Sequence, residues 1–362
     1  MKELIIGDLV AKVPIVQGGM AVGISVSGLA SAVASAGGIG VIATAGIGHL
    51  DMNAHTNYTQ VNNAALIVEI RKAKEKSKGI IGVNIMVALS NYAEQVRVAI
   101  EEGIDIIFSG AGLPLNLPGY LPEGNKTKLV PIVSSGKAAA IIARRWIDKY
   151  NHIPDAIVVE GPRAGGHLGF KKENLFDPKY ELENLLPDVL KQAKLLEDKY
   201  KKSIPVIPAG GIYTGADIYK YIKMGASGVQ MATRFVATFE CDASDEFKQS
   251  YLQAKKEDVI IIDSPVGMPG RAIRNQFLTD VGLGQKKPFK CPFHCIITCN
   301  IKEAPYCIAE ALLNATEGRI NDGFAFSGAN VYRINDIVHV KDLISSLEAE
   351  YNSAEELDKR RK

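Results

Sequence analysis

The sequence predicts an α/β protein: a (β/α)8 TIM barrel over residues 1–262, followed by a C-terminal extension over residues 263–362 that packs on the barrel. Eight apolar runs rich in valine and isoleucine recur along the chain, and each precedes a helical segment or a loop that leads to one. Nearly continuous apolar runs are typical of parallel strands that are buried on both faces. The eight units fill roughly the first 235 residues, close to the usual size of about 250 residues for such a barrel.

The same alternation of strands and helices also fits a doubly wound open sheet, which is the alternative fold. That fold often carries a G-x-G-x-x-G motif after its first strand, and no such motif follows the first strand here. We therefore expect the barrel.

The predicted strands are the apolar runs themselves, which lie at residues 13–17, 39–44, 80–87, 104–110, 128–135, 155–161, 204–211 and 226–234. Between them, helices are expected at 27–38, 61–77, 91–102, 137–149, 183–201 and 214–225. The first of these helices is rich in alanine and is ended by Gly37 and Gly38, a C-cap signal. Asp217 is placed to help start the last one.

Beyond the eighth unit, residues 235–262 predict a helix and a strand at VIIID. A segment rich in glycine, proline and cysteine follows, and a polar helix is expected from about residue 337 to the end of the chain. No linker and no repeat other than the strand–helix rhythm marks off a second domain.

The composition is that of an ordinary water-soluble protein, with 47% apolar and 23% charged residues and a net charge of +2. Because there is no basic excess, neither nucleic acid nor an anionic membrane is an expected partner. No apolar run approaches the ~18 residues of a membrane span, and the N-terminus lacks the apolar core of a signal peptide. We expect a cytoplasmic protein with a small-molecule substrate, and a homodimer is left open.

The stretch 158–169, VVEGPRAGGHLG, is the first candidate site. In a barrel of this kind, chemistry gathers where the strands end, and here a strand ends in a glycine-rich loop that carries His167. Small neighbours leave room for a ligand beside the imidazole. With an ordinary pKa of ~6.5, a histidine there could move protons at neutral pH. The alternative is a loop histidine with a purely structural role.

The loops after the seventh and eighth strands are candidates for binding phosphate. Gly210 and Gly211 would let the backbone approach phosphate oxygens, and Thr233 could add a hydroxyl. Glycines in one such loop would indicate only a tight turn, but their occurrence after both strands favours an anion site. Asn84 lies inside an apolar strand, so its amide either bridges structural groups or contacts a ligand.

For other polar residues near these segments we expect no role in chemistry. His49 and His55 lie in a polar loop and are expected to be solvated. Glu160 and Arg163 are close enough in sequence to form a local ion pair.

Five segments together resemble one known family: PIVQGGMA, GVNIMV, VEGPRAGGHLG, PAGGI and GVQMATRF, in this order. They resemble the nitronate monooxygenase (2-nitropropane dioxygenase) family, whose close relatives are flavin-dependent enoyl-ACP reductases. The resemblance covers about residues 10 to 280. It implies a (β/α)8 barrel with non-covalently bound FMN, in agreement with the independent count of strands.

By this resemblance, the backbone at residues 19–21 and Asn84 line the flavin ring, Gly165 approaches it, and the segments near 211 and 230–233 hold the phosphate. His167 matches the catalytic histidine of the family. The full set of FMN-binding residues that we expect is Gly19, Met20, Ala21, Asn84, Glu160, Gly165, Gly210, Gly211, Gln230, Met231, Ala232 and Thr233.

Three positions depart from the family pattern. Glu160 stands where many nitronate monooxygenases have glutamine, whereas the enoyl reductases tend to carry glutamate. Arg163 replaces an acid, and Ala232 replaces a common glycine.

The main expectation is the oxidation of alkyl nitronates with oxygen, for which Arg163 would suit the anionic substrate. The alternative is NAD(P)H-dependent reduction of an enoyl thioester, and a flavin-binding regulatory protein without turnover is a third hypothesis.

Four of the five cysteines crowd into residues 291–307, where Cys291, Cys295, Cys299 and Cys307 form the pattern C-x3-C-x3-C-x7-C. Four thiolates this close could hold an iron–sulfur cluster or zinc. The spacing matches none of the common C-x2-C patterns, so free or partly paired cysteines are the alternative.

Overall fold

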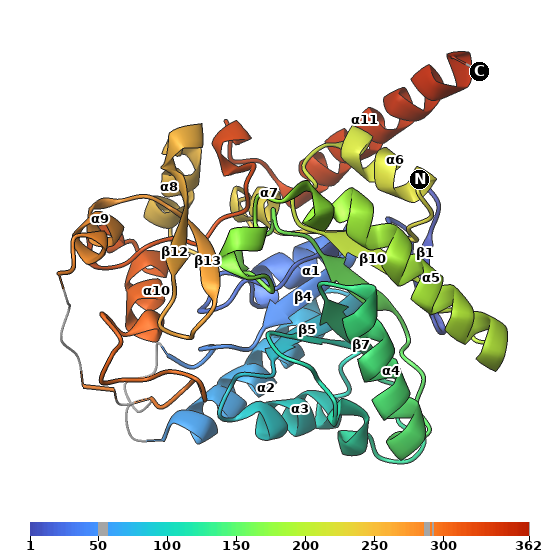
Figure 1. Cartoon of the computed structure of the whole chain (residues 1–362), viewed down its shortest axis with the longest axis horizontal. Helices are drawn as coiled ribbons and strands as arrows, with labels where there is room; N and C mark the ends of the chain where they lie inside the picture. Colours follow the sequence, from blue (N-terminus) through green and yellow to red (C-terminus); the bar gives the residue numbers. More distant parts are fainter. Residues whose placement is uncertain (50–56, 286–289, 292, 362) are drawn as a thin grey trace.

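A computed structural model describes residues 1–49, 57–285, 290, 291 and 293–361 (Figure 1). Its centre is a closed barrel of parallel strands in the order β10-β11-β3-β4-β5-β6-β7-β8, which confirms the predicted barrel and excludes the open sheet. Closure comes from β11, which pairs with β3 on one side and with β10 on the other. The strands are β3 (Ile15–Gln17), β4 (Ile39–Ala43), β5 (Ile80–Met86), β6 (Ile106–Gly110), β7 (Lys128–Val133), β8 (Ile157–Glu160), β10 (Val206–Ala209) and β11 (Val229–Met231).

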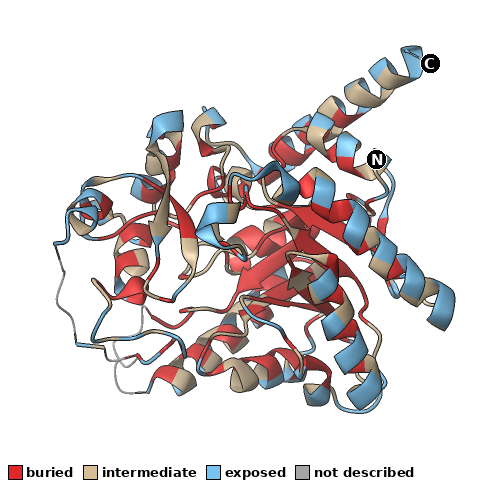
Figure 2. Cartoon of the chain, in the orientation of Figure 1, coloured by how far each residue is buried: buried red, intermediate tan, exposed pale blue. Residues whose placement is uncertain are grey.

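The helices between the strands lie where the sequence predicts them, and Figure 2 shows their outer faces exposed around a buried barrel. Helix α6 begins with a capping box between Thr214 and Asp217, so the predicted role of Asp217 is confirmed. The helices are α1 (Ser27–Ser35), α2 (Tyr58–Lys76), α3 (Tyr92–Glu101), α4 (Gly136–Tyr150), α5 (Leu182–Tyr200), α6 (Gly215–Lys223) and the short α7 (Thr233–Val236).

An N-terminal hairpin closes one end of the barrel. Its strands, β1 (Leu4–Ile6) and β2 (Leu9–Ala11), lead directly into β3 and therefore lie at the N-terminal ends of the barrel strands. Leu4 and Ile6 are fully buried in the same apolar cluster as Val16 and Phe108 from the barrel interior. Burial of this kind stabilises by roughly 25 cal/mol per Å² of apolar surface. The opposite, C-terminal end is left for a site.

The chain after the barrel forms a compact extension beside it, drawn in yellow to orange in Figure 1. It contains the helices α8 (Asp245–Gln253), α9 (Gln276–Gly282) and α10 (Ile308–Thr316) and the antiparallel strands β12 (Val259–Asp263) and β13 (Pro269–Ile273). The helix and the strand expected within 235–262 are therefore present, and the boundary expected after residue 262 falls inside β12. The polar helix expected at the end of the chain is α11 (Val340–Arg360), which packs along α6 and projects from the body in Figure 1.

The extension is joined to the barrel by a strand that the sequence did not predict. Strand β9 (Gly166–His167) lies in the loop after β8 and pairs antiparallel with β13, with Gly270 opposite His167 and Arg271 opposite Gly166. Arg271 strengthens this link, because its buried guanidinium Nη1 donates to the carbonyl oxygens of Pro162 and Ala164, each at 2.6 Å. Burial lowers the pKa of Arg271 to about 10, so that the side chain stays charged at neutral pH.

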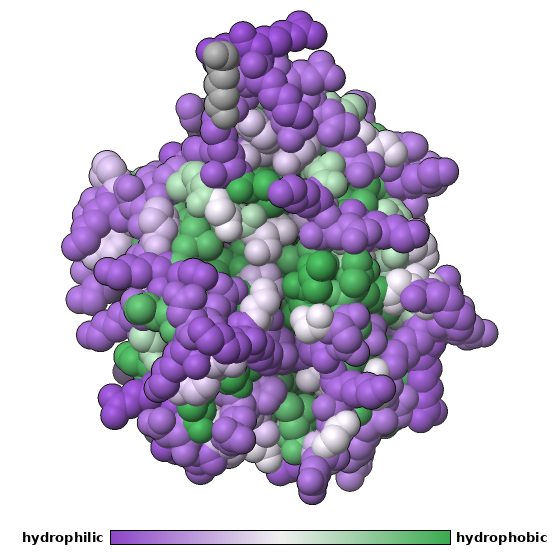
Figure 3. Space-filling model, turned by 90° about the vertical axis from the view of Figure 1, so that its right-hand side faces the viewer, coloured by the Kyte–Doolittle hydropathy of each residue, from purple (hydrophilic) through white to green (hydrophobic). Residues whose placement is uncertain are grey.

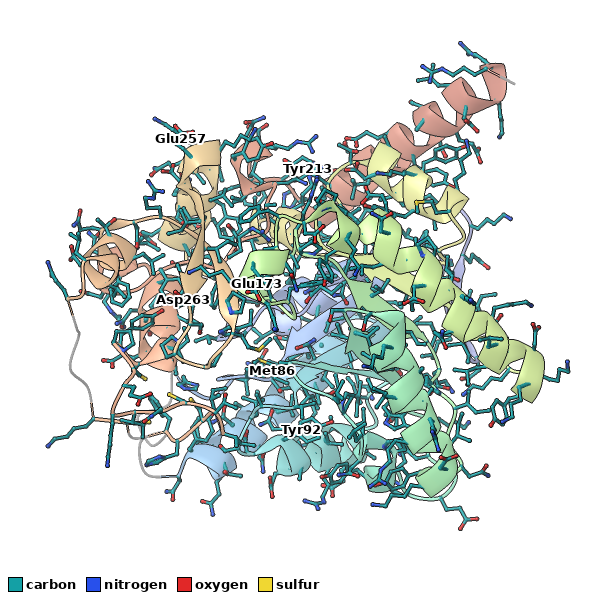
Figure 4. All side chains as sticks on the ribbon, in the orientation of Figure 1. Met86, Tyr92, Glu173, Tyr213, Glu257 and Asp263 are labelled. Carbon is teal, nitrogen blue, oxygen red and sulfur yellow. The ribbon has the colours of Figure 1, made fainter. Side chains whose placement is uncertain are left out.

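A second, surface link joins the same parts of the chain. Asp263, labelled at the end of β12 in Figure 4, accepts a hydrogen bond at 2.9 Å from Lys172, which follows His167 in the chain. Both side chains are largely exposed, so this pair contributes little to stability. The buried bonds of Arg271 are the stronger tie.

The face of the molecule that Figure 3 draws is mainly hydrophilic. Figure 3 shows the face formed by the right-hand side of Figure 1, where polar and charged side chains surround separate apolar patches. Among the helices in the described ranges, none combines the length and the apolar character needed to cross a bilayer.

Replacing Arg271 with methionine is expected to loosen the loop that carries His167. Two buried carbonyl groups would lose their partner, so the free energy of unfolding should fall by about 2–4 kcal/mol. Urea denaturation measures the loss, and hydrogen exchange of the 162–168 segment should become faster. Arg274→Met is the matched control, because Arg274 is exposed and makes neither of these bonds. Equal stability and exchange in the two variants would contradict the proposed tie.

Candidate active site

A cavity of about 290 Å³ opens at the C-terminal ends of the barrel strands. It is near the lower limit of the ~300–1,000 Å³ typical of small-molecule sites. Segments far apart in the sequence, from both the barrel and the extension, meet here. All the barrel residues that the sequence analysis selected line it, namely Gly19, Met20, Ala21, Asn84, Glu160, Gly165, His167, Gly210, Gly211, Gln230, Met231, Ala232 and Thr233.

His167 lies on β9 with its ring at the cavity wall. Its Nε2 is 2.8 Å from the hydroxyl of Ser264, and the ring of Phe326 packs against it edge to face at 5.0 Å. Burial lowers the pKa of His167 to about 4. The pKa near 6.5 assumed from the sequence is therefore wrong: without a carboxylate partner, the buried ring is neutral at pH 7. A neutral imidazole can still donate one hydrogen bond and accept another.

Glu160 ends β8 and is the only carboxylic acid among the described residues that line the cavity. Burial of the carboxyl group raises the pKa of Glu160 to about 7, because it disfavours the charged form. At neutral pH this carboxyl group is therefore close to half protonated. A carboxyl group in this state is well matched to proton transfer near pH 7.

Arg163 does not pair with Glu160, so the local ion pair expected from the sequence is wrong. Its guanidinium instead makes a two-pronged contact with Glu181, with Nε 2.9 Å from Oε2 and Nη2 3.0 Å from Oε1. This contact raises the pKa of Arg163. Although Arg163 lines the cavity, its charge is already matched by a carboxylate at the surface.

The loops after β10 and β11 form one end of the cavity. Gly210 and Gly211 have φ angles of +92° and +86°, a conformation that glycine adopts readily and other residues adopt at a cost. The extension holds both loops: Asn330 donates to the carbonyl oxygen of Gly211 at 2.7 Å, and the N–H of Gly328 donates to the hydroxyl oxygen of Thr233 at 3.0 Å. The hydroxyl proton of Thr233 is thereby left free to point toward a ligand.

Sequence reasoning missed the residues that the extension contributes to the cavity. Ser327 is one of them: it is 3% exposed, and its hydroxyl has no hydrogen-bond partner within the described chain. A buried polar group without a partner is uncommon and often marks a place where a ligand or water binds. Its backbone lies so close to Gly165 that a Cβ on Gly165 would be 2.6 Å from the Ser327 carbonyl carbon. No sequence motif marks Ser327, and only the fold brings it here.

The extension also makes one wall of the cavity apolar. The side chains of this wall are Val266, Ile296, Ile308, Leu312 and Phe326. The polar loop before α2 adds His49, which is 6% exposed and contacts the rings of Tyr58 and Phe293. The expectation that His49 is solvated is therefore wrong, because Tyr58 and, from the extension, Phe293 pack against its ring. His55 lies outside the described residues.

The cysteines of the extension are free thiols, with Cys295 at the cavity wall and Cys307 buried beside it. Burial is the main cause that raises the pKa of Cys295 to about 12 and that of Cys307 to about 11. Across the described ranges, no three histidine, cysteine, aspartate or glutamate side chains converge to hold a metal ion. The thiols of Cys291, Cys299 and Cys307 lie close enough to Cys295 to raise its pKa further, and the iron–sulfur cluster or zinc that the spacing suggests stays a prediction.

Comparisons with known proteins point to one family. The sequence model of the nitronate monooxygenase family matches residues 3–350. A (3aS,4S,5R,7aS)-5-hydroxy-7a-methyl-1-oxo-octahydro-1H-indene-4-carboxyl-CoA dehydrogenase of Mycobacterium tuberculosis is 29% identical over 273 residues, which are 75% of this chain and 66% of that protein. A probable nitronate monooxygenase of Staphylococcus saprophyticus is 26% identical over 298 residues, with 75% of this chain and 78% of that protein covered. This chain thus spans slightly less than two thirds of the length of the dehydrogenase.

Solved structures match over nearly the whole chain. FabK from Thermotoga maritima superposes with a TM-score of 0.73 at 28% identity and covers 97% of this chain and 96% of its own. A nitroalkane oxidase from Streptomyces ansochromogenes has a TM-score of 0.72 at 21% identity, with 95% and 97% covered, and at that identity shows a shared fold alone.

Replacing Glu160 with glutamine is expected to stabilise the flavin-free protein at high pH only. Because the pKa of Glu160 is raised on folding, its ionisation opposes folding as the pH rises from about 4.5 through 7. The variant should match the wild type at pH 5 and exceed it by roughly 1–3 kcal/mol at pH 8. Urea denaturation at both pH values measures this difference. Glu257→Gln, at an exposed site labelled in Figure 4, is the control and should show no such pH dependence. A gain at pH 5 equal to that at pH 8 would contradict the raised pKa.

Proposed function

The chain belongs to the nitronate monooxygenase family of oxidoreductases, and we propose that it is an FMN-dependent enzyme that uses NAD(P)H to reduce an enoyl thioester with a bulky apolar acyl group. The observation that carries the choice of substrate is the apolar wall that the extension adds beside His167. Such a wall gains free energy by burying an acyl group, at roughly 25 cal/mol per Å². The M. tuberculosis relative, named for a bicyclic acyl-CoA, supports the same substrate class.

Several features of the cavity fit FMN. Backbone at Gly19 and Gly165 offers close approach to a planar ring, and Gly210, Gly211 and Thr233 offer backbone and hydroxyl groups to a phosphate. The unpartnered hydroxyl of Ser327 belongs to the segment between Gly165 and Thr233, since its backbone abuts Gly165 and the N–H of the next residue, Gly328, bonds to Thr233; in our proposal it adds one more donor to the phosphate. A bound flavin would supply the transfer of a hydride, and the protein has to supply position and protons.

The proton chemistry is assigned to Glu160 and His167. Reduction of the double bond adds a hydride to the β-carbon and a proton to the α-carbon, so each turnover consumes one proton at the site. In our proposal Glu160, which is close to half protonated at pH 7, delivers this proton and regains one from solvent. His167, which is neutral at that pH, holds the thioester carbonyl oxygen with an N–H and so stabilises the negative charge that develops there.

Oxidation of nitronates with oxygen, the main expectation from the sequence, is the second candidate. The family model and the S. saprophyticus relative favour it. Against it stands the state of Arg163, the one cationic side chain among the described residues at the cavity wall, because Glu181 already neutralises its charge. An anionic nitronate would thus meet an apolar wall and a neutral histidine, which disfavours its binding.

The hydroxyl of Ser327 gives a test for the cofactor. Ser327→Ala is expected to weaken FMN binding about 10-fold, the equivalent of one hydrogen bond to a charged group, and to leave riboflavin binding unchanged. Fluorescence titration of the flavin-free protein with each ligand measures both affinities. Ser250→Ala serves as the control, since Ser250 lies on α8 and its hydroxyl donates to the carbonyl oxygen of Phe247. Equal losses for FMN and riboflavin would remove Ser327 from the phosphate end.

The reaction itself is tested by an anaerobic titration of the FMN-loaded protein with NADH and NADPH. The absorbance of the oxidised flavin should be lost rapidly when NADH or NADPH is added. It should return when crotonyl-CoA or a larger enoyl-CoA is added and reoxidises the flavin. Oxygen consumption with a nitronate and without NAD(P)H, together with no bleaching, would contradict the reductase and establish the second candidate. Bound FMN that responds to neither treatment would favour the regulatory hypothesis.

A further inference from the structure

We infer that Ser264 is a positioning residue that sets the ring orientation and the tautomer of His167, so that the C-terminal extension completes the active site of the barrel. The contact that carries this inference is the 2.8 Å separation between Ser264 Oγ and His167 Nε2. It joins residues 97 positions apart in the sequence, across the junction between barrel and extension. The inference rests on the proposed role of His167.

The position of the Ser264 hydroxyl is fixed by the turn that contains it. Ser264 follows β12 and is 7% exposed. Its N–H donates to the carbonyl oxygen of Met268 at 3.1 Å, and its own carbonyl accepts from the N–H of Gly267 at 2.9 Å. The turn between β12 and β13 is therefore closed by backbone bonds on both sides of the serine. Such a hydroxyl is held by the fold and does not have to be ordered by the histidine.

The backbone of His167 is held by the same hairpin. His167 stands opposite Gly270 in the β9–β13 pair, and the next residue, Leu168, donates its N–H to Pro269 at 2.8 Å. What remains free is rotation of the imidazole about its side-chain bonds and the choice of the nitrogen that carries the proton. The edge-to-face contact with Phe326 restricts the plane of the ring, and the bond to Ser264 selects which nitrogen faces the hairpin.

The tautomer follows from the shared hydrogen bond. A neutral imidazole has one N–H and one bare nitrogen, and the hydroxyl can satisfy either. Ser264 Oγ already accepts from the N–H of Val266 at 3.4 Å, and among the described residues Nε2 is the one acceptor that its own proton reaches, so donation to Nε2 satisfies both atoms of this buried hydroxyl. The proton of His167 then resides on Nδ1, and Nδ1–H is the group available to a substrate oxygen. Without the hydroxyl, both tautomers become populated and the ring is free to turn over.

A nuclear magnetic resonance experiment tests this directly. In protein labelled with ¹⁵N-histidine and free of substrate, long-range ¹H–¹⁵N spectra at pH 7 report the protonation of each ring nitrogen, and a His167→Gln spectrum assigns the signals of His167. The wild type should show a single tautomer with the proton on Nδ1. Ser264→Ala should show averaged nitrogen shifts, and Ser264→Thr, which keeps the hydroxyl, should restore the wild-type pattern. An unaltered His167 tautomer in Ser264→Ala would overturn the inference.

Steady-state kinetics of the FMN-loaded enzyme give a second, independent test of the role of Ser264. With the substrate that the wild type turns over, Ser264→Ala should lower kcat about 10- to 100-fold with little change in KM, and Ser264→Thr should recover most of it. Ser250→Ala is the matched control and should retain activity. Equal kcat in Ser264→Ala and wild type would also overturn the inference. If no NAD(P)H-dependent reaction is found, the proposed function fails, while the resonance experiment still decides the role of Ser264.

Discussion

The antiparallel pairing of β9 with β13 is the constraint on which the site depends. A two-residue strand inside a glycine-rich loop has little stability of its own, and here it is fixed by a hairpin about 100 residues further along the chain. Arg271 adds buried bonds from the same hairpin to the loop that precedes His167. The position of the imidazole is therefore a property of the extension as much as of the barrel. Loosening the hairpin would displace His167 without altering the barrel strands.

The electrostatics of the cavity follow from the same arrangement. By covering the C-terminal end of the barrel, the extension removes water from Glu160 and His167 without placing an opposite charge beside either of them. Desolvation alone raises the pKa of Glu160 to about 7 and lowers the pKa of His167 to about 4. The order of the two pKa values is therefore the reverse of that in water. In our proposal this reverses the usual assignment of roles at neutral pH: the carboxyl group exchanges protons, and the imidazole acts as a neutral hydrogen-bonding group.

The barrel could be predicted from the sequence because its information is local. Each strand is an apolar run, and the loops after them carry glycines at positions where backbone conformation requires them, as at Gly210 and Gly211. The features that escaped prediction are those set by distant contacts. Arg163 is paired with Glu181 instead of Glu160, and His49 is buried against Phe293 of the extension. Ser327 reaches the cavity from beyond the region of family resemblance, and Ser264 contacts His167 from near the end of that region. The cysteine spacing predicts a shared neighbourhood correctly, because the thiols of Cys291, Cys299 and Cys307 act on the pKa of Cys295, whereas a metal or cluster there stays a prediction.

A crystal structure of the protein with FMN and a non-reactive acyl-CoA analogue would test the central claim, that barrel and extension build one active site together. The acyl group should lie against Val266, Ile308 and Phe326, with its carbonyl oxygen within hydrogen-bonding distance of His167 and with the bond from Ser264 to that histidine intact. An acyl group seated on the barrel alone, out of contact with the extension, would contradict the account.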